Sequence, residues 1–259
     1  MRQGEILFYV LLIVALLCGY YYQNSHKALV ASTHVDEANQ SSKPDTARAI
    51  IKTSFAGTTF PVVFEAAFHQ KTLAFSVNDS LDFRVYEIGK LKIESGYLIA
   101  CDPIVMNEGV AFTQRFPVGQ FSVQLAMAKW AGDERVAFSR ILFSNEPVAH
   151  WSFALTPGQK PLSLRDSTVY CYGVDGGAGV FIDKIANRVF AMKSHRDWEY
   201  IFIKKAEENG YKGFIHNFDQ HNLATFSTGM GDGCYATYIG YDEKGRVCRL
   251  LTDFGLVNW

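Results

Sequence analysis

The feature that most constrains this chain is an uninterrupted apolar segment near its N-terminus. Ile6–Tyr22 reads ILFYVLLIVALLCGYYY, with no charged residue, no proline and a single glycine. A helix of this length reaches about 25 Å, close to the roughly 30 Å hydrocarbon core of a bilayer. The three tyrosines at its end suit the head-group region, where the ring is buried and the hydroxyl stays wet. We predict an N-terminal transmembrane helix.

The charges that flank this segment predict its orientation. Arg2 precedes it, and no Lys or Arg follows until Lys27. Cytoplasmic flanks carry the excess of basic residues, so the N-terminus is expected in the cytoplasm and the rest of the chain outside it, in the periplasm of a Gram-negative host. Three alternatives stay open: a signal peptide cleaved near Ala31, lipidation of Cys18, and a buried core helix. We favour a retained membrane anchor.

The remaining sequence divides into a linker and one globular domain. Residues 1–5 form a short tail, and residues 23–48 are rich in Ser, Asn, Gln, Thr and Lys, which predicts a flexible tether. Residues 49–259 are expected to form a single domain. The sequence pI is about 6.7 and no long run of Lys and Arg is present, so a nucleic-acid partner is not expected.

Short runs of alternating apolar and polar residues dominate the domain and predict strands. Two segments have helical spacing, 179–192 and 198–208, the second followed by the helix stop Asn209-Gly210. Asp242–Gly245 is typical of a hairpin turn. The strands are expected at 62–68, 91–93, 98–100, 121–128, 136–143, 148–155, 168–172, 234–241 and 246–252. The expected fold class is α+β, predominantly β, with about two helices.

Four cysteines lie in the domain, at positions 101, 171, 234 and 248. Outside the cytosol they could form up to two disulfides, in three connectivities. They could equally be small buried apolar residues. The sequence does not decide between these states.

Two glycine-rich acidic stretches are the strongest candidates for a site. They are Tyr172–Asp183 (YGVDGGAGVFID) and Ser227–Tyr235 (STGMGDGCY), the second completed by Asp253. Glycine lets a ligand approach the backbone, and interleaved carboxylates act as acid and base or bind hard cations. Gly-Asp pairs also simply make tight turns. The candidate catalytic residues are Asp175, Asp183, Asp232 and Asp253.

Motifs of well-known cofactor and metal sites are absent from the sequence. Gly231-x-Gly233 is followed by a strand pattern, not by the helix that a dinucleotide site needs. His216 and His221 match no common metal-site spacing, and a Cys171 or Cys234 nucleophile lacks an identifiable partner. No metal and no cofactor is predicted.

Several motifs together resemble the domain-of-unknown-function family 4241. The likeness extends over residues 86–254. Its motifs are Gly89–Leu91, Gly96–Pro103, Phe116–Gly119, Arg135–Arg140, Pro147–Trp151, Val174–Gly179 and Gly231–Tyr235.

The resemblance implies one fold over this range and marks family-type positions, but it implies no reaction. These positions are Asp102, Asp175, Asp232, Gly233 and Asp253. The candidate binding residues are Asp102, Gly177, Gly179, Gly231, Gly233 and Tyr235. Where the family pattern reads Asp-Ala-Gly-Thr-Gly, residues 175–179 read DGGAG, so the threonine hydroxyl is replaced by Ala178.

Two function classes fit these observations. The first is a non-catalytic protein-binding module, of which a membrane-tethered immunity protein that captures a toxin is one concrete form. The second is a hydrolase with an acidic, metal-assisted site at the two Gly-Asp loops. The first is favoured, because it needs no catalytic motif.

Overall fold

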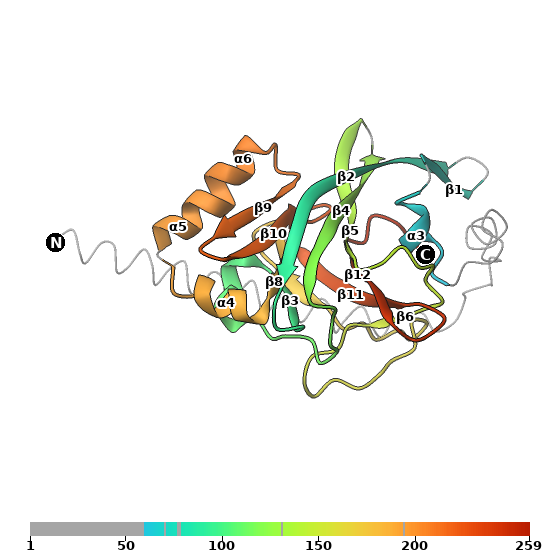
Figure 1. Cartoon of the computed structure of the whole chain (residues 1–259). Helices are drawn as coiled ribbons and strands as arrows, with labels where there is room; N and C mark the ends of the chain where they lie inside the picture. The colour runs from blue at the N-terminus through green and yellow to red at the C-terminus, as the bar shows by residue number, and fades with distance from the viewer. Residues whose placement is uncertain (1–59, 70, 77–78, 131, 194) are drawn as a thin grey trace, which may run out of the picture. The chain divides into compact units, whose positions relative to one another are not determined.

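The computed structural model describes residues 60–69, 71–76, 79–130, 132–193 and 195–259. Twelve strands within these ranges form two antiparallel sheets (Figure 1). This confirms the predicted predominance of β structure. The predicted membrane segment, 6–22, and the linker, 23–48, lie outside the described residues. Among the helices that are described, none is long and apolar enough to span a bilayer.

The larger sheet has the strand order β1-β2-β4-β5-β12-β11-β6, and the short strand β7 also pairs with β11. The long strand β2 curves across the domain and pairs with β4 along most of its length (Figure 1). The strands are β1 (Thr72–Ser76), β2 (Asp79–Ile93), β4 (Gly119–Trp130), β5 (Asp133–Leu142), β6 (His150–Phe153), β7 (Tyr172–Val174), β11 (Gly233–Tyr241) and β12 (Val247–Asp253).

The smaller sheet has the order β3-β8-β10-β9. Its strands are β3 (Leu98–Cys101), β8 (Ala178–Asp183), β9 (Gly213–Phe218) and β10 (His221–Ser227). Strand β8 lies between β3 and β10 and is buried along nearly its whole length. It therefore reads as one continuous apolar run in the sequence.

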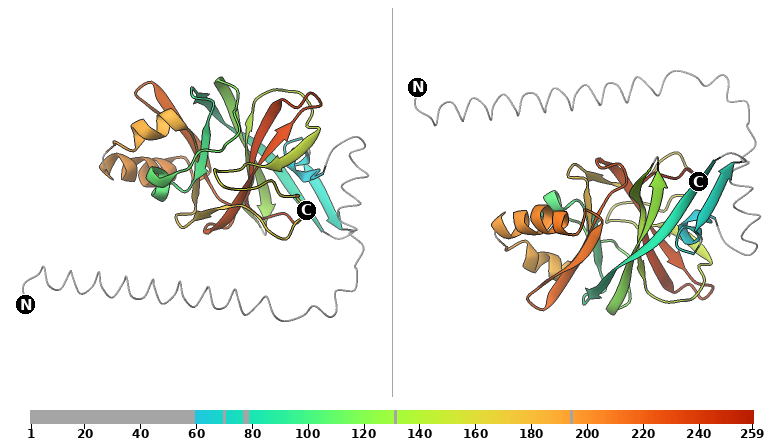
Figure 2. Two further views of the ribbon diagram at one scale, coloured as in Figure 1. Left: turned by 90° about the horizontal axis from the view of Figure 1, so that it is seen from below. Right: turned by 90° about the horizontal axis from the view of Figure 1, so that it is seen from above.

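Helices lie against the outer face of each sheet (Figure 2). The smaller sheet is covered by η2 (Pro103–Glu108), α4 (Lys184–Phe190) and a continuous helical stretch of α5 (His195–Glu199), η3 (Tyr200–Lys205) and α6 (Ala206–Glu208). The larger sheet is covered by the single turn α3 (Val63–Ala66) and by the C-terminal residues up to Trp259. Phe64 of α3 packs against Trp151, Tyr238 and Trp259.

The central core lies between the two sheets. Leu125, Ile141 and Leu250 of the larger sheet share one apolar cluster with Phe181 and Phe226 of the smaller sheet. A second contact is polar, because Asn222 of β10 accepts a hydrogen bond from the Lys92 amide (2.8 Å) and donates one to the Lys90 carbonyl (3.0 Å) of β2. Burial of apolar area between the sheets supplies the main stabilisation. The two hydrogen bonds of the Asn222 side chain hold β10 in one position against β2.

The structure corrects several predicted elements. Residues 62–68, predicted as a strand, form the turn α3, because Val63, Phe64 and Ala66 bury one helical face while Glu65 turns toward two arginines. The predicted helix 179–192 is strand β8 followed by α4, which begins after Asp183. The predicted strand 168–172 lies instead at Tyr172–Val174. Strands β1, β9, β10 and residues 79–90 of β2 were not predicted.

One disulfide forms in the described part of the chain, between Cys171 and Cys234. Cys101 and Cys248 are free and buried. Burial raises the pKa of the Cys101 thiol to about 12 and that of the Cys248 thiol to about 11. Both therefore stay protonated at neutral pH and behave as apolar core residues.

Candidate functional site

The two glycine-rich acidic loops lie side by side. Val174 pairs with Gly233 in the β7–β11 ladder, and the Thr228 amide donates to the Gly177 carbonyl (3.2 Å). Asp175 follows Val174 and Asp232 precedes Gly233, so both residues lie at the same end of this ladder. Both are exposed. The structure thus brings together two of the four candidate carboxylates.

The buried side chain of Asp102 fixes the backbone of the first loop, at Asp175 and Gly176. It is 2% exposed, and its Oδ2 accepts hydrogen bonds from the amides of Asp175 (2.7 Å) and Gly176 (3.0 Å). Its Oδ1 accepts from the Ile104 amide (2.6 Å) and so caps η2. A buried carboxylate that receives three amide donors is a strong structural anchor. Asp102 therefore positions the loop and does not face a ligand.

Tyr235 orders the second loop in a similar way. Its hydroxyl donates to the Gly231 carbonyl (2.8 Å), and its ring packs against Phe254. Burial raises the pKa of this hydroxyl, which keeps it a neutral donor. Like Asp102, Tyr235 positions backbone and does not present its own polar group to solvent.

The four candidate glycines fall into two pairs. A Cβ at Gly177 (φ 62°) would meet only the Gly231 Cα at 3.7 Å, and one at Gly231 (φ 110°) would meet nothing. A Cβ at Gly179 would come within 2.7 Å of Phe226, and one at Gly233 within 2.9 Å of the Tyr235 ring. The first pair leaves open backbone at the surface, whereas the second pair allows tight core packing.

Asp183 does not join this site. It lies at the opposite end of β8 from Ala178, about 16 Å away along an extended strand. Its Oδ2 accepts from the amides of Glu94 and Ser95 and from the Ser95 hydroxyl, and its Oδ1 caps α4 through the Ile185 amide. The carboxylate is fully buried. Its role is to begin α4 and hold the 94–95 turn.

Asp253 is also placed elsewhere. Its Oδ2 accepts from Trp259 Nε1 (2.6 Å) and its Oδ1 from the Gly255 amide (2.8 Å). Burial raises its pKa to about 6, although these two hydrogen bonds counteract the shift. Burial and the nearby Asp253 carboxylate raise the pKa of Tyr238, whose ring belongs to the core on the outer face of the larger sheet. Tyr235, beside the second loop, belongs instead to the core between the sheets. The expected pocket lined by all four carboxylates is therefore not formed.

His216 and His221 each contact a different charged side chain. His216 Nδ1 lies 3.4 Å from Lys205 Nζ, and burial together with Lys205 lowers its pKa to about 4. His221 Nδ1 contacts a Glu94 carboxylate oxygen. Within the described residues, no group of three or more His, Cys, Asp or Glu side chains is placed to hold a metal ion.

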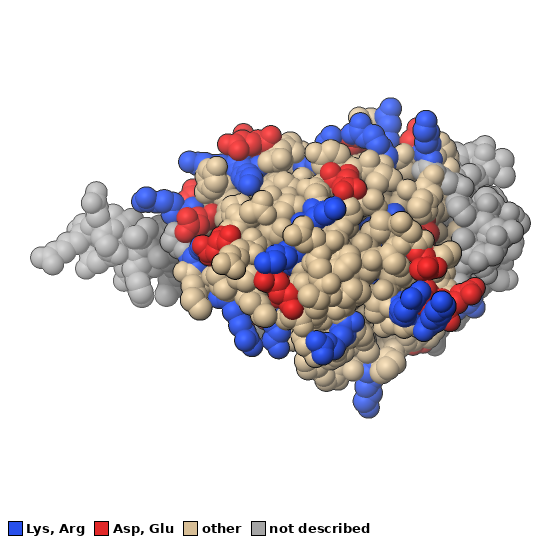
Figure 3. All heavy atoms as spheres, in the orientation of Figure 1, with Lys and Arg blue, Asp and Glu red and all other residues tan. Residues whose placement is uncertain are grey.

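A polar groove of about 600 Å³ lies beside the two loops. It meets an apolar cleft of about 130 Å³, and the two hollows share Gly177, Tyr211 and Ser227. The groove is lined by Gly132, Gly177, Gly210, Gly229 and Gly231 together with Asp133, Glu134, Arg135, Tyr211 and Lys212. Exposed backbone and charges of both signs therefore surround one depression, and charges of both signs are also mixed on the face in Figure 3.

Tyr211 stands where the groove and the cleft meet. It is 58% exposed, and its backbone has φ 54°. Its amide donates to the Ala206 carbonyl (2.9 Å) and closes the turn that follows the last helical residue, Glu208, in which Gly210 has φ 62°. A bulky residue rarely adopts this left-handed conformation, and such outliers cluster at functional sites. Sequence reasoning missed Tyr211; the only signal was an aromatic residue directly after the predicted helix stop.

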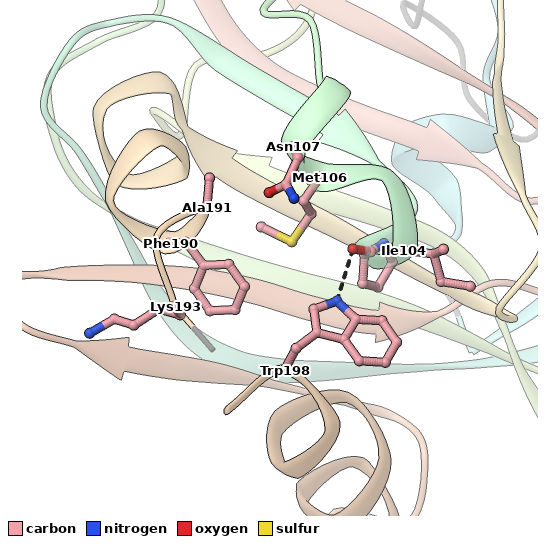
Figure 4. Close-up of a pocket in the computed structure, with 8 residues that line it drawn as sticks. Ile104, Met106, Asn107, Phe190, Ala191, Lys193 and Trp198 are labelled. Carbon is pink, nitrogen blue, oxygen red and sulfur yellow. Dashed lines mark hydrogen bonds between the residues drawn. The ribbon is translucent and has the colours of Figure 1, made fainter. Parts of the chain in front are cut away.

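A separate cavity of about 320 Å³ lies between η2, α4 and α5 (Figure 4). Trp198 closes one side and donates from Nε1 to the Pro103 carbonyl (3.1 Å). Ile104, Met106 and Phe190 supply its apolar wall, with Lys193 at the edge. None of the predicted site residues lines it.

The family comparison bears on the same part of the chain. The family model described as "Protein of unknown function (DUF4241)" matches residues 91–252, more than half of the chain. The chain belongs to this family. The match includes both Gly-Asp loops, the disulfide, the groove and Tyr211, whereas α3 and β1 precede it. Searches of curated proteins and of solved structures find no match.

Proposed function

We propose that this domain is a non-catalytic protein-binding module, held outside a membrane by residues 6–22, and that it acts as an immunity protein that captures a toxin. The observation that carries the proposal is the placement of Tyr211. An exposed tyrosine in a left-handed conformation stands between a polar groove and an apolar cleft.

Tyrosine at such a place is suited to bind protein. It offers a large apolar surface and a polar tip, and it loses little conformational entropy on binding. The two loops beside it are fixed in advance by Asp102, by Tyr235 and by the Cys171–Cys234 bond. A site that is already ordered loses less entropy when a partner docks.

The disulfide supports the compartment in this proposal. Disulfides persist in oxidising compartments and are rare in the cytosol. An anchor at residues 6–22 with the domain outside would give Cys171 and Cys234 such a compartment. It would also hold the binder at the surface that an incoming toxin must cross, which raises the effective concentration of the binder.

The proposal predicts a toxin gene beside the gene of this protein, and binding to that toxin is its test. The full-length protein in membrane vesicles is expected to retain this toxin and to protect the host cell from it. Loss of residues 6–22 should leave binding intact but reduce protection, because the effective concentration falls. Failure of the full-length protein to bind or protect would count against the proposal.

One observation favours the hydrolase alternative, namely that Asp175 and Asp232 lie at the same end of the β7–β11 ladder. If they act as acid and base, Asp175→Asn or Asp232→Asn should each reduce hydrolysis roughly 100-fold or more. A binding module predicts that cell protection survives both substitutions. Protection lost together with measurable hydrolysis would favour the enzyme.

A further inference from the structure

A second large cavity, of about 630 Å³, lies on the outer face of the larger sheet beneath α3. It is remote in sequence from the Gly-Asp loops and uses different strands. Its walls are mainly apolar. They come from Pro61, Val62, Phe68, Val85, Leu142, Pro147, Val148 and Trp151, with Glu65, His69, Gln124, Arg140, Asn145 and Arg249 as the polar members.

Two buried arginines share one carboxylate in this cavity. Arg249 donates to both oxygens of Glu65, from Nε (3.1 Å) and from Nη2 (3.2 Å). Arg140 donates from Nη1 to the same carboxylate (3.1 Å). The side chains of Arg140 and Arg249 are only 3% and 4% exposed. Glu65 is the acid among the residues that line the cavity, and it balances one of the two arginines. One buried positive charge is therefore left over.

Arg249 and Arg140 differ in how fully they are bonded. Arg249 also donates to the carbonyls of Ser144 and Cys248, so all its nitrogens are used. Arg140 gives Nε to Gln124 (3.0 Å), stacks over the Phe68 ring, and makes no hydrogen bond from Nη2 to any described residue. Burial lowers its pKa to about 10, with Arg249 adding to the shift and Glu65 opposing it. It stays charged at neutral pH.

An uncompensated buried charge is costly unless a counter-ion binds it. A ligand with one negative charge would balance this excess, which is a single positive charge. It must also carry an apolar body, because Phe68, Val148 and Trp151 line the remaining space. Cavities of this volume suit small organic molecules. A planar carboxylate matches the hydrogen-bonding geometry of a guanidinium group.

We propose that this cavity binds a small organic carboxylate, with its anionic group on Arg140 and its apolar body against Trp151. His69, 58% exposed, and Val85, 39% exposed, border the entrance. Arg140 and Trp151 belong to two of the motifs that carry the family resemblance. The site is independent of the partner-binding function proposed above.

Fluorine NMR of the full-length protein in detergent micelles, labelled with 5-fluorotryptophan, tests this site. The chain has four tryptophans, so each signal can be assigned by single replacement. Phenylacetate and octanoate are the probes, and phenylacetamide is the uncharged control. We expect a saturable shift of the Trp151 signal with the carboxylates, no shift of Trp198, and at least roughly tenfold weaker binding of the amide.

Matched variants distinguish a ligand site from a purely structural charge cluster. Arg140→Gln should weaken carboxylate binding at least roughly tenfold, whereas Arg188→Gln, an exposed change on α4, should not. In the Arg140→Gln variant, Arg249 and Glu65 remain as a pair of opposite charges. The signals of the other fluorotryptophans report whether this variant folds. As a second pair at the exposed entrance, Val85→Glu should weaken binding and Val85→Lys should not. The absence of a saturable shift with either carboxylate would overturn the proposal. So would carboxylate binding to Arg140→Gln, and amide binding to the wild type, that are both as tight as carboxylate binding to the wild type.

Discussion

Cys171 is bonded to Cys234 where β7 meets β11, and their Cα atoms lie 5.4 Å apart. Cys234 is paired with Gly173 in the same ladder. The bond therefore joins the residue before β7 to β11, and Asp175 and Asp232 lie at one end of the ladder that these two strands form. It closes a span of 63 residues.

Removal of this bond should destabilise the domain. The Cys171→Ala/Cys234→Ala double variant is expected to lose about 2–4 kcal/mol of unfolding free energy, because its unfolded chain is no longer restricted. Urea unfolding of the folded protein measures the loss. A reducing agent should destabilise the wild type by a similar amount and leave the double variant unchanged. Equal stability of the two proteins under oxidising conditions would contradict the assignment.

Asp183 and Asp175 should differ in what they contribute to stability. Asp183→Ala removes the acceptor for the amides of Glu94, Ser95 and Ile185 in a buried place, so we expect a loss of at least about 2 kcal/mol. Asp175→Ala removes an exposed carboxylate and should change stability by less than about 0.5 kcal/mol. Equal effects in thermal or urea unfolding would show that Asp183 does not anchor α4.

The raised pKa of Asp253 predicts a pH dependence. The folded protein holds this proton up to about pH 6, whereas an ordinary Asp side chain loses it near 3.8. The folded state therefore binds more protons between these values, and the contribution of Asp253 to stability falls as pH rises through this window. The stability of Asp253→Asn relative to wild type should rise between pH 4 and pH 7, by up to about 3 kcal/mol. A difference that stays constant over this range would contradict the shift.

Phe64 should be among the most sensitive core positions. It is fully buried, and its ring packs against Phe138, Trp151, Tyr238 and Trp259. Phe64→Ala is expected to cost about 3–5 kcal/mol of unfolding free energy, because the cavity left by the ring cannot collapse fully against the sheet. Phe64→Leu should cost clearly less. A change below about 1 kcal/mol for the alanine variant would show that α3 does not pack as described.

Features with local causes were predictable from the sequence. The β11–β12 hairpin follows from alternation on both sides of Asp242–Gly245, where the Gly245 amide bonds the Asp242 carbonyl and Gly245 has φ 72°. Asn209-Gly210 ends the second helical stretch as predicted. Such turns are determined by a few neighbouring residues.

Features that depend on distant partners were not predictable. The run of Val, Phe and Ala at 62–68 favours a strand by composition, but contacts of Glu65 with Arg140 and Arg249 belong to a helical turn. Strand β8 has helical spacing yet is buried between two neighbours. The two Gly-Asp loops were identified, but the separate bonds of Asp183 and Asp253 depend on Ser95 and Trp259. Arg140 shares one face of β5 with Phe138, and that period-two position was an unused signal of a buried charge.

The most direct test of the proposed binding function is the affinity of the full-length protein for the toxin that the proposal predicts to be encoded beside its gene. Tyr211→Asn is the informative variant, since asparagine tolerates φ 54° and the change replaces the phenol group with a small amide. Tyr200→Asn removes a comparably exposed tyrosine from η3 and serves as the matched control. The account predicts that Tyr211→Asn weakens binding by at least about 30-fold and Tyr200→Asn by less than about threefold. Unchanged affinity for Tyr211→Asn in a folded protein would contradict it.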